Sequence, residues 1–329
     1  MRRKVSFLLA LLMVLVLFAA CGQDAKTTPS EKPEQSAAPE ESQAAEDKVY
    51  KIGFAVNDFN DKWVTYVMDN AESWDEETAE AEVTLGNGKN DTSVQLQIVE
   101  DWITQGYDAI CVKPVEIDAA KVMAEKCKEA GIPYVAVQQD IGGGDVTVGP
   151  DIFECGRVEM QGVVDALDGK GKVAYLAGEP GVLISTLRRD GSVSVVEENP
   201  DIELVAEELG LWQRDKAQNI VETWIQGGVE FDAICAANDE MAIGAILALE
   251  ASNMLEGKVI AGIDGTPDAL EYMEKGKLTF TMYADPVGLA KESLNCALKL
   301  AKGETVEDVV LYDTLVTLEE VEIYKAKWE

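Results

Sequence analysis

Cys235-Ala-Ala-Asn-Asp-Glu-Met-Ala-Ile-Gly-Ala-Ile-Leu-Ala-Leu-Glu250 is the stretch that decides the fold. It continues from an apolar segment that starts at Phe231, and after its polar pair the apolar residues have helical spacing. Asn238 or Asp239 can cap that helix by accepting a backbone N–H. The pair therefore lies where a strand ends and a helix begins, the edge of an open α/β sheet at which ligands bind. A helix cap alone would also explain the polar pair, so the choice between a cap and a ligand-binding site depends on the rest of the sequence.

Short apolar segments alternate with amphipathic segments on both sides of this stretch, which predicts parallel strands joined by helices. We expect two α/β lobes, each a doubly wound parallel sheet with helices on both faces. The expected strands are 51–56, 82–85, 108–112, 133–137, 147–148, 172–177, 202–211, 232–236, 259–263, 280–283 and 309–314. The expected helices are 63–80, 94–106, 119–130, 152–167, 186–198, 215–226, 238–250, 267–275 and 287–301, with a short helix at the end.

The composition excludes several classes of function. The net charge is −33, whereas a nucleic-acid-binding protein should carry a basic patch. The chain has no histidine, which removes histidine bases, catalytic triads and histidine metal ligands. None of its six cysteines form a Cys-x-x-Cys pair, and Cys111 and Cys235 lie in apolar runs typical of buried thiols. We therefore expect no metal, no cofactor and no disulfide.

The amino terminus has the features of a secretory signal. Basic residues at positions 2–4 precede an apolar run, and small residues precede Cys21. This ending resembles a bacterial lipobox, which implies cleavage after residue 20 and a lipid on Cys21; the alternative is an ordinary signal followed by an incidental cysteine. Residues 21–47 are rich in Ala, Glu, Ser, Pro and Gln and cannot build a core. The sequence thus predicts a signal peptide at 1–20, a lipidated flexible tether at 21–47 and an extracytoplasmic, membrane-anchored protein.

Polar and aromatic residues follow most of the predicted strands. Since the carboxyl ends of parallel strands meet at one edge, we expect these side chains to gather on one rim of each sheet. Carboxylates, amides and arginine hold neighbouring hydroxyls with paired hydrogen bonds, and an indole covers the apolar face of a ring, so the pattern predicts a polyol site. Trp63 and Trp212 could instead be core residues. The residues are Asn57, Asp58, Asp61 and Trp63; Gln138, Gln139 and Asp140; Arg188; Trp212 to Asp215; Asn238 and Asp239; Asp264 to Asp268; and Asp285.

Two motifs, Asn238-Asp-Glu-Met-Ala-Ile-Gly-Ala245 and Gly262-Ile-Asp-Gly-Thr-Pro-Asp268, resemble those of the periplasmic sugar-binding proteins of the ribose, galactose and inositol type, which serve ABC importers. Ile132-Pro133, Trp212 and Gly276-Lys-Leu278 extend the resemblance over about residues 48 to 315. It implies the type I periplasmic binding protein fold, with a three-segment hinge near 151, 285 and 314. The implied N-terminal lobe is 48–151 plus 285–313, and the implied C-terminal lobe is 152–284 plus 314–329.

The resemblance also implies ligand-binding roles. Arg188 matches an arginine that grips ring substituents, while Asn238 and Asp264 match an amide and a carboxylate. At Ala284 the chain departs from the family, which usually has Asn or Gln there; either Asp285 substitutes or the ligand presents one polar group fewer. Two tryptophans suit a six-membered ring, so we favour a pyranose or a cyclitol such as inositol. The implied ligand-binding set is Asn57, Asp61, Trp63, Gln138, Gln139, Arg188, Trp212, Asn238, Asp264 and Asp285.

The expected function is capture of a small sugar or polyol by lobe closure, followed by delivery to the membrane permease of an ABC importer. We expect a monomer that does not act as an enzyme, because no nucleophile–base pair accompanies carboxylates such as Asp61 and Asp264. A sugar or autoinducer receptor for chemotaxis or quorum signalling remains an alternative with the same fold. The effector domain of the lac repressor family has this fold too, but it would need an N-terminal helix-turn-helix and a basic surface.

Overall fold

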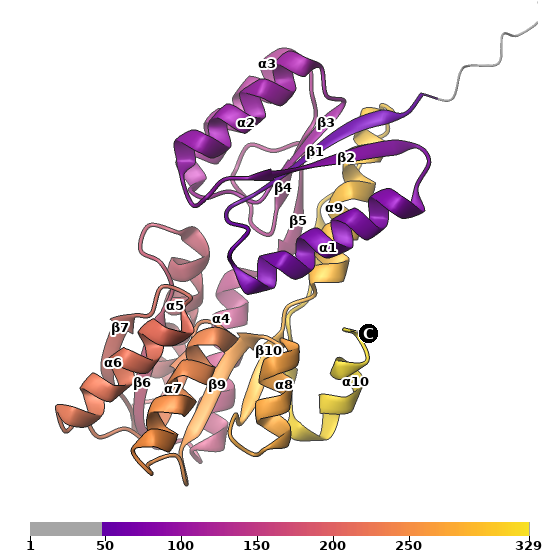
Figure 1. Ribbon diagram of the computed structural model, residues 1–329. Helices are drawn as coiled ribbons and strands as arrows, with labels where there is room; N and C mark the ends of the chain where they lie inside the picture. Colours follow the sequence, from indigo (N-terminus) through magenta and orange to yellow (C-terminus); the bar gives the residue numbers. More distant parts are fainter. Residues whose placement is uncertain (1–47, 329) are drawn as a thin grey trace, which may run out of the picture. The chain divides into compact units, whose positions relative to one another are not determined.

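The computed structural model describes residues 48–328, which belong to one compact unit in which strands and helices alternate (Figure 1). The predicted signal peptide, lipidation site and tether fall on residues 1–47, which lie outside the described residues. The strands are β1 (Tyr50–Val56), β2 (Ala81–Asn87), β3 (Ala109–Val112), β4 (Tyr134–Val137), β5 (Val146–Pro150), β6 (Gly171–Ala177), β7 (Ile202–Leu209), β8 (Ala233–Ala236), β9 (Val259–Asp264), β10 (Phe280–Tyr283), β11 (Val309–Leu311) and β12 (Thr314–Val316).

The helices connect these strands and confirm the predicted alternation, with several beginning one to three residues before the predicted start. They are α1 (Lys62–Glu77), α2 (Thr92–Gln105), α3 (Ile117–Ala130), α4 (Ile152–Ala166), α5 (Leu183–Glu198), α6 (Arg214–Gln226), α7 (Asp239–Ala251), α8 (Pro267–Glu274), α9 (Pro286–Ala301) and α10 (Val321–Lys325), with a 3-10 turn at Leu318–Glu320.

The strands form two six-stranded sheets, in the orders β11-β5-β4-β3-β1-β2 and β12-β10-β9-β8-β6-β7. The first sheet is parallel, and α1 and α9 pack together on one of its faces (Figure 1). In the second sheet β6 to β10 are parallel and β12 is antiparallel to β10. Two α/β sheets covered by helices confirm the predicted fold class, while the exact lobe boundaries stay a prediction.

One strand prediction is wrong. Residues 309–314 were expected to form a single strand, but β11 ends at Leu311 in the first sheet and β12 starts at Thr314 in the second. The chain passes from one sheet to the other at Tyr312 and Asp313, so the apolar residues on either side pack into different cores. Periodicity cannot reveal such a break, because both short strands have the same apolar pattern.

Each sheet is buried between its helices. Trp74 and Trp102 pack in the cores of the first sheet and Trp224 packs in that of the second. Cys111 and Cys235 are buried, and the five cysteines of the described chain are all free. Within residues 48–328 no helix combines the length and apolarity that crossing a membrane requires.

A buried acidic side chain lies on α4, a helix that packs against the second sheet. Glu159 on α4 is wholly buried, and both of its carboxylate oxygens lack a hydrogen-bond partner among the described residues. Burial raises the pKa of Glu159 to about 8, although the charge of Arg188 opposes this shift. Between pH 4.5 and pH 8 the folded protein therefore retains a proton that the unfolded chain has released, and the free energy of unfolding falls as the pH rises through this window.

We predict that Glu159→Gln stabilises the protein at pH 8 but not at pH 5. Because each pKa unit corresponds to about 1.4 kcal/mol, the gain in free energy of unfolding at pH 8 should be roughly 2–4 kcal/mol. Urea unfolding at both pH values measures it. Glu197→Gln, at an exposed position on α5, is the matched control and should change neither value. A Glu159→Gln effect that is equal at pH 5 and pH 8 would contradict the assignment.

Candidate functional site

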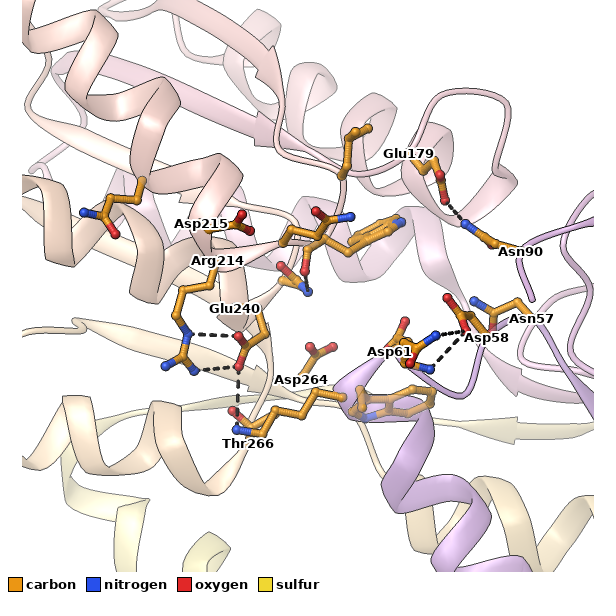
Figure 2. A pocket seen from close by; sticks show the side chains of 18 residues that line it. Asn57, Asp58, Asp61, Asn90, Glu179, Arg214, Asp215, Glu240, Asp264 and Thr266 are labelled. Atoms are coloured by element: carbon orange, nitrogen blue, oxygen red, sulfur yellow. Dashed lines mark hydrogen bonds and ion pairs between the residues drawn. The ribbon is translucent and has the colours of Figure 1, made fainter. Parts of the chain in front are cut away.

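A cavity of about 500 Å³ lies at the carboxyl ends of the strands and is lined by residues that follow strands of both sheets (Figure 2). We call it the outer pocket, and the smaller cavity that adjoins it the inner pocket. Asn57, Asp61, Trp63, Trp212, Asn238 and Asp264 line both. The inner pocket is completed by Lys113, Gln138, Val182, Ile184 and Arg188. The outer pocket adds Asp58, Asn60, Lys62, Asn90, Glu179, Leu211, Gln213, Arg214, Asp215, Gln218, Glu240 and Thr266.

The first sheet contributes the loop after β1. Asp61 caps α1 by accepting a hydrogen bond from the backbone N–H of Val64 at 3.2 Å, which places its carboxylate at the helix start. Trp63 is only 6 % exposed, and its Nε1 donates to the carbonyl oxygen of Ala284 at 3.1 Å. Trp63 is therefore both part of the core and a wall of the pocket, so the two interpretations offered by its sequence position do not exclude each other.

Arg188 on α5 points inward and Arg189 does not. The Arg188 side chain is 3 % exposed, and its Nη1 donates to the carbonyl oxygen of Ala237 at 2.6 Å. Its Nε has no hydrogen-bond partner among the described residues. Arg189 instead pairs with Glu207 at the surface. Arg188 thus brings a buried cation with unused donor capacity to the inner pocket.

Trp212 lies in the turn between β7 and α6, where it and Leu211 have positive φ angles of 64° and 55°. The indole packs where Gly178 leaves room, because a Cβ on Gly178 would lie 2.0 Å from the ring. The guanidinium carbon of Arg188 lies 6.0 Å from the ring centroid. The strained turn therefore holds one face of the indole against the second sheet and leaves the residue partly exposed in both pockets.

One member of the opening pair, Asn238, takes both of the roles that the sequence offered, helix cap and pocket residue. Asn238, rather than Asp239, caps α7: its Oδ1 accepts from the N–H of Met241 at 3.0 Å, and it still lines both pockets. Asp239 is fully buried and accepts hydrogen bonds from Thr281 Oγ1 at 2.6 Å and from Thr266 N and Oγ1 at 2.8 and 3.1 Å. Burial raises the pKa of Asp239 to about 7 despite these bonds.

Asp264 ends β9 with a φ angle of 129°, a conformation that costs free energy for a non-glycine residue. Its carboxylate is almost buried, lines both pockets and has no hydrogen-bond partner among the described residues. Burial and the charge of Asp239 raise its pKa, against the attraction of Arg188. A strained, buried and unpaired carboxylate at a cavity is typical of a binding or catalytic site.

The structure does not bring every predicted residue into these pockets. Gln138 lines the inner pocket, but its neighbour Gln139 is buried outside both. Asp285 caps α9 through the N–H of Gly288 at 3.0 Å and lines a separate small cavity beside Ala284. Ala284 and Asp285 therefore both line that small cavity, and neither lines the outer or the inner pocket.

Sequence analysis missed Lys113 and part of the charged rim, namely Lys62 and Glu240, while Arg214 and Asp268 are among the strand-end residues it named. Lys62 Nζ lies 2.6 Å from Asp268 Oδ2, and Arg214 Nη2 lies 2.7 Å from Glu240 and 3.0 Å from Asp268. A second contact links Asn90 to Glu179 at 2.6 Å (Figure 2). The Lys62–Asp268 and Asn90–Glu179 contacts join elements of the first sheet to those of the second, whereas Arg214 pairs within the second. Each is partly exposed, so each contributes little stability alone.

The arrangement is suited to hydroxyl recognition. Carboxylates accept hydrogen bonds, Arg188 donates them, and the amides of Asn57, Gln138 and Asn238 do both. Among residues 48–328 no group of three or more His, Cys, Asp and Glu side chains is placed to hold a metal ion. The outer pocket carries more carboxylates than cations, whereas the inner pocket balances Asp61 and Asp264 against Lys113 and Arg188.

A family model described as "Periplasmic binding protein domain" matches residues 52–305. Among curated proteins, a putative rhizopine-binding protein of Rhizobium meliloti is 35% identical over 265 residues, covering 78% of this chain and 86% of its own. A xylitol-binding protein of Mycolicibacterium smegmatis is 32% identical over 286 residues, covering 85% and 80%. The ribose import binding protein RbsB of Bacillus subtilis is 28% identical over 312 residues, covering 94% and 97%.

The similar solved structures are also solute-binding proteins of ABC transporters. An ABC transporter solute binding protein from Bacillus halodurans with bound myo-inositol has a TM-score of 0.83 and 33% identity, covering 86% of this chain and all of that one. A periplasmic solute binding protein from Actinobacillus succinogenes with bound D-allose has a TM-score of 0.78 and 27% identity, covering 84% and 100%.

We predict that Gly178→Ala displaces the Trp212 ring, because the new methyl group would overlap it. Overpacking of this kind should cost about 1–3 kcal/mol in free energy of unfolding and change the tryptophan emission and near-UV circular dichroism. Gly143→Ala is the control, since a Cβ there meets nothing within 4 Å and the backbone is not in the left-handed region. Unaltered spectra for Gly178→Ala would show that the indole is not held in this position.

Proposed function

This chain belongs to the periplasmic binding protein family, and from that premise we propose that it captures a neutral monosaccharide or cyclitol for an ABC importer. The observation that carries the proposal is the inner pocket, where four charged side chains face one space without forming an ion pair with one another. We propose a binding protein rather than an enzyme, since the relatives and neighbours that we compared are binding proteins.

Unpaired charges in a buried space need hydrogen-bond partners, because leaving them unsatisfied costs free energy. A polyol supplies hydroxyls that donate to Asp61 and Asp264 and accept from Arg188. The side-chain amides of Asn57, Gln138 and Asn238 can either donate a hydrogen bond to a hydroxyl oxygen or accept one from the hydroxyl O–H. Equal numbers of positive and negative groups in the inner pocket favour an uncharged ligand over an acid or an amine.

Two indoles favour a ring. Trp63 from the first sheet and Trp212 from the second both line the inner pocket and offer apolar surface to the C–H face of a saccharide. The myo-inositol bound by the 33% identical neighbour supports a cyclitol, while relatives named for xylitol and ribose keep the class at neutral polyols. We therefore propose a six-membered ring, with myo-inositol as the first candidate.

Capture proceeds by closure of two lobes, 48–151 plus 285–313 and 152–284 plus 314–329, about the three chain crossings near 151, 285 and 314. A ligand favours the closed state because only there do residues of both sheets contact it at once. The rim contacts between Lys62 and Asp268 and between Asn90 and Glu179 support this mechanism, since they join the same two halves. The closed form then docks on the permease.

The proposed location is the outer side of the cell membrane, with Cys21 carrying the lipid and 22–47 acting as the tether. The basic, apolar and small-residue segments before Cys21 support this location. In cells producing the full chain, Cys21→Ser should release the protein from the membrane fraction, whereas Cys127→Ser at a buried position should not. Membrane retention of Cys21→Ser would remove the lipid anchor from the proposal.

We predict that isothermal calorimetry detects binding of at least one of myo-inositol, D-allose, D-ribose and xylitol to the purified protein. Small-angle scattering of the same samples should show a smaller radius of gyration with the bound polyol. A sugar phosphate is the negative control, since its charge disturbs the balance of the inner pocket. No heat with any neutral sugar or polyol, in a protein that unfolds cooperatively, would overturn the proposal.

We predict that Trp212→Ala weakens polyol binding by roughly 1–3 kcal/mol, by analogy with the loss of an aromatic side chain that stacks on a nucleic-acid base. Calorimetry gives the value directly. Ile323→Ala on α10 is the control, because that side chain is 63 % exposed and outside both pockets. An affinity unchanged by Trp212→Ala would remove the indole from the ligand site and leave it as a packing residue.

A further inference from the structure

Lys113 is the first residue after β3, an inner strand of the first sheet, and its backbone is held rigidly. Its N–H donates to the carbonyl oxygen of Ala55 at 2.8 Å. Its carbonyl oxygen accepts from Nε2 of Gln95 at 2.9 Å, and Oε1 of Gln95 accepts from the N–H of Val115 at 2.9 Å. Because Gln95 is wholly buried, these bonds fix the direction in which the lysine leaves the strand.

The Lys113 side chain is buried at the inner pocket without a counter-ion. It is 5 % exposed, and Nζ donates to Asn57 Oδ1 at 2.7 Å. Among residues 48–328 no carboxylate lies within 4.0 Å of Nζ, and Asn57 is the one acceptor that the structure places within hydrogen-bond reach. An ammonium has three N–H donors, so two remain for a group in the pocket.

Several charged groups face Lys113 across the pocket. Asp61 and Asp264 attract its positive charge, and Arg188 repels it. Burial is the largest influence and lowers the pKa of Lys113 to about 8. The ammonium therefore predominates at neutral pH but loses its proton at mildly alkaline pH, unlike an exposed lysine.

We propose that Lys113 is a ligand-binding residue, whose ammonium donates hydrogen bonds to a hydroxyl oxygen of the captured polyol. This inference rests on the proposed function and deepens it. A buried cation with free donors is costly until an acceptor arrives, and a hydroxyl oxygen supplies one without adding charge. Lys113 follows a strand of the first sheet, and Arg188 lies on a helix beside the second sheet. Hydrogen bonds from these two residues therefore hold the ligand from both halves of the molecule.

The consequence is a capture that depends on pH. Only the protonated lysine donates all of its hydrogen bonds to ligand and Asn57, so affinity should be nearly constant up to pH 7 and fall above pH 8. With a pKa of about 8, binding at pH 9 should be about tenfold weaker than at pH 7. Asp264 and Asp239 also have raised pKa values, so the wild-type profile must be compared with that of a Lys113 variant.

The test is calorimetry at pH 7 and pH 9 with myo-inositol, and with D-ribose, xylitol and D-allose if myo-inositol does not bind. Lys113→Met should bind at least tenfold more weakly at pH 7 and lose the further weakening at pH 9. Lys113→Arg keeps a charge that does not titrate, so its affinity should be the same at both pH values. Lys121→Met, at a side chain that is 51% exposed on α3, is the control and should behave as the wild type.

A second variant separates contact with the ligand from positioning of Asn57. If Lys113 acted only by holding Asn57, Lys113→Met would have no effect in an Asn57→Ala background; we expect it to weaken binding there as well. Thermal unfolding verifies that each variant is folded. If Lys113→Met does not fold, the Lys113 side-chain NMR signal of the labelled wild-type protein should shift when myo-inositol or the bound polyol is added.

Two failures are distinguishable. If the wild type binds a polyol but folded Lys113→Met has the same affinity and pH profile, or the NMR signal does not move at saturation, Lys113 is not a ligand-binding residue and the proposed function stands. If the wild type binds none of myo-inositol, D-ribose, xylitol and D-allose at either pH, the proposed function fails and the role of Lys113 fails with it.

Discussion

The pocket edge of the second sheet depends on the buried carboxylate of Asp239. It accepts hydrogen bonds from Thr266 at the start of α8 and from Thr281 on β10, while its own helix is capped by Asn238. One side chain thus ties together the ends of three consecutive βα connections. Because Asp264 lies two residues before Thr266, the same bonds hold Asp264 in its strained conformation beside the pocket.

Separate anchoring of each side chain explains how acidic and basic groups can line the same small pocket without forming ion pairs with one another. Asp61 is held at a helix start, Arg188 by the carbonyl of Ala237 and Lys113 by Asn57, and these attachments lie on different elements. Each charged group is restrained by its own backbone or neutral neighbour rather than by an opposite charge. The hydrogen-bonding capacity that remains is therefore directed into the cavity, which is the condition for preorganised recognition.

Sequence reasoning predicted the two-sheet fold and the clustering of strand-end residues, because hydrophobic periodicity and the geometry of parallel sheets are local properties of the chain. The pocket position of Arg188 was expected from the family resemblance. It left open which of Asn238 and Asp239 caps the helix, because the partners that occupy Asp239 lie 27 and 42 residues further along. It missed Lys113, although the rule that found the other residues applies equally to the end of β3. It placed Asp285 in the site, whereas the helix cap that Asp285 forms turns it toward another cavity. Tertiary packing determines which side chains bond to one another, and the spacing of residues along the sequence does not reveal these pairs.

The acidic rim of the outer pocket has a kinetic consequence. Asp58, Glu179 and Asp215 add negative charge at the mouth, beyond what Lys62 and Arg214 offset. A phosphorylated metabolite approaching this mouth meets a repulsive potential that salt would screen, whereas an uncharged sugar does not sense it. The excess of acidic side chains at the rim should therefore slow the approach of anions to this cavity through long-range repulsion, before any hydrogen bond is formed.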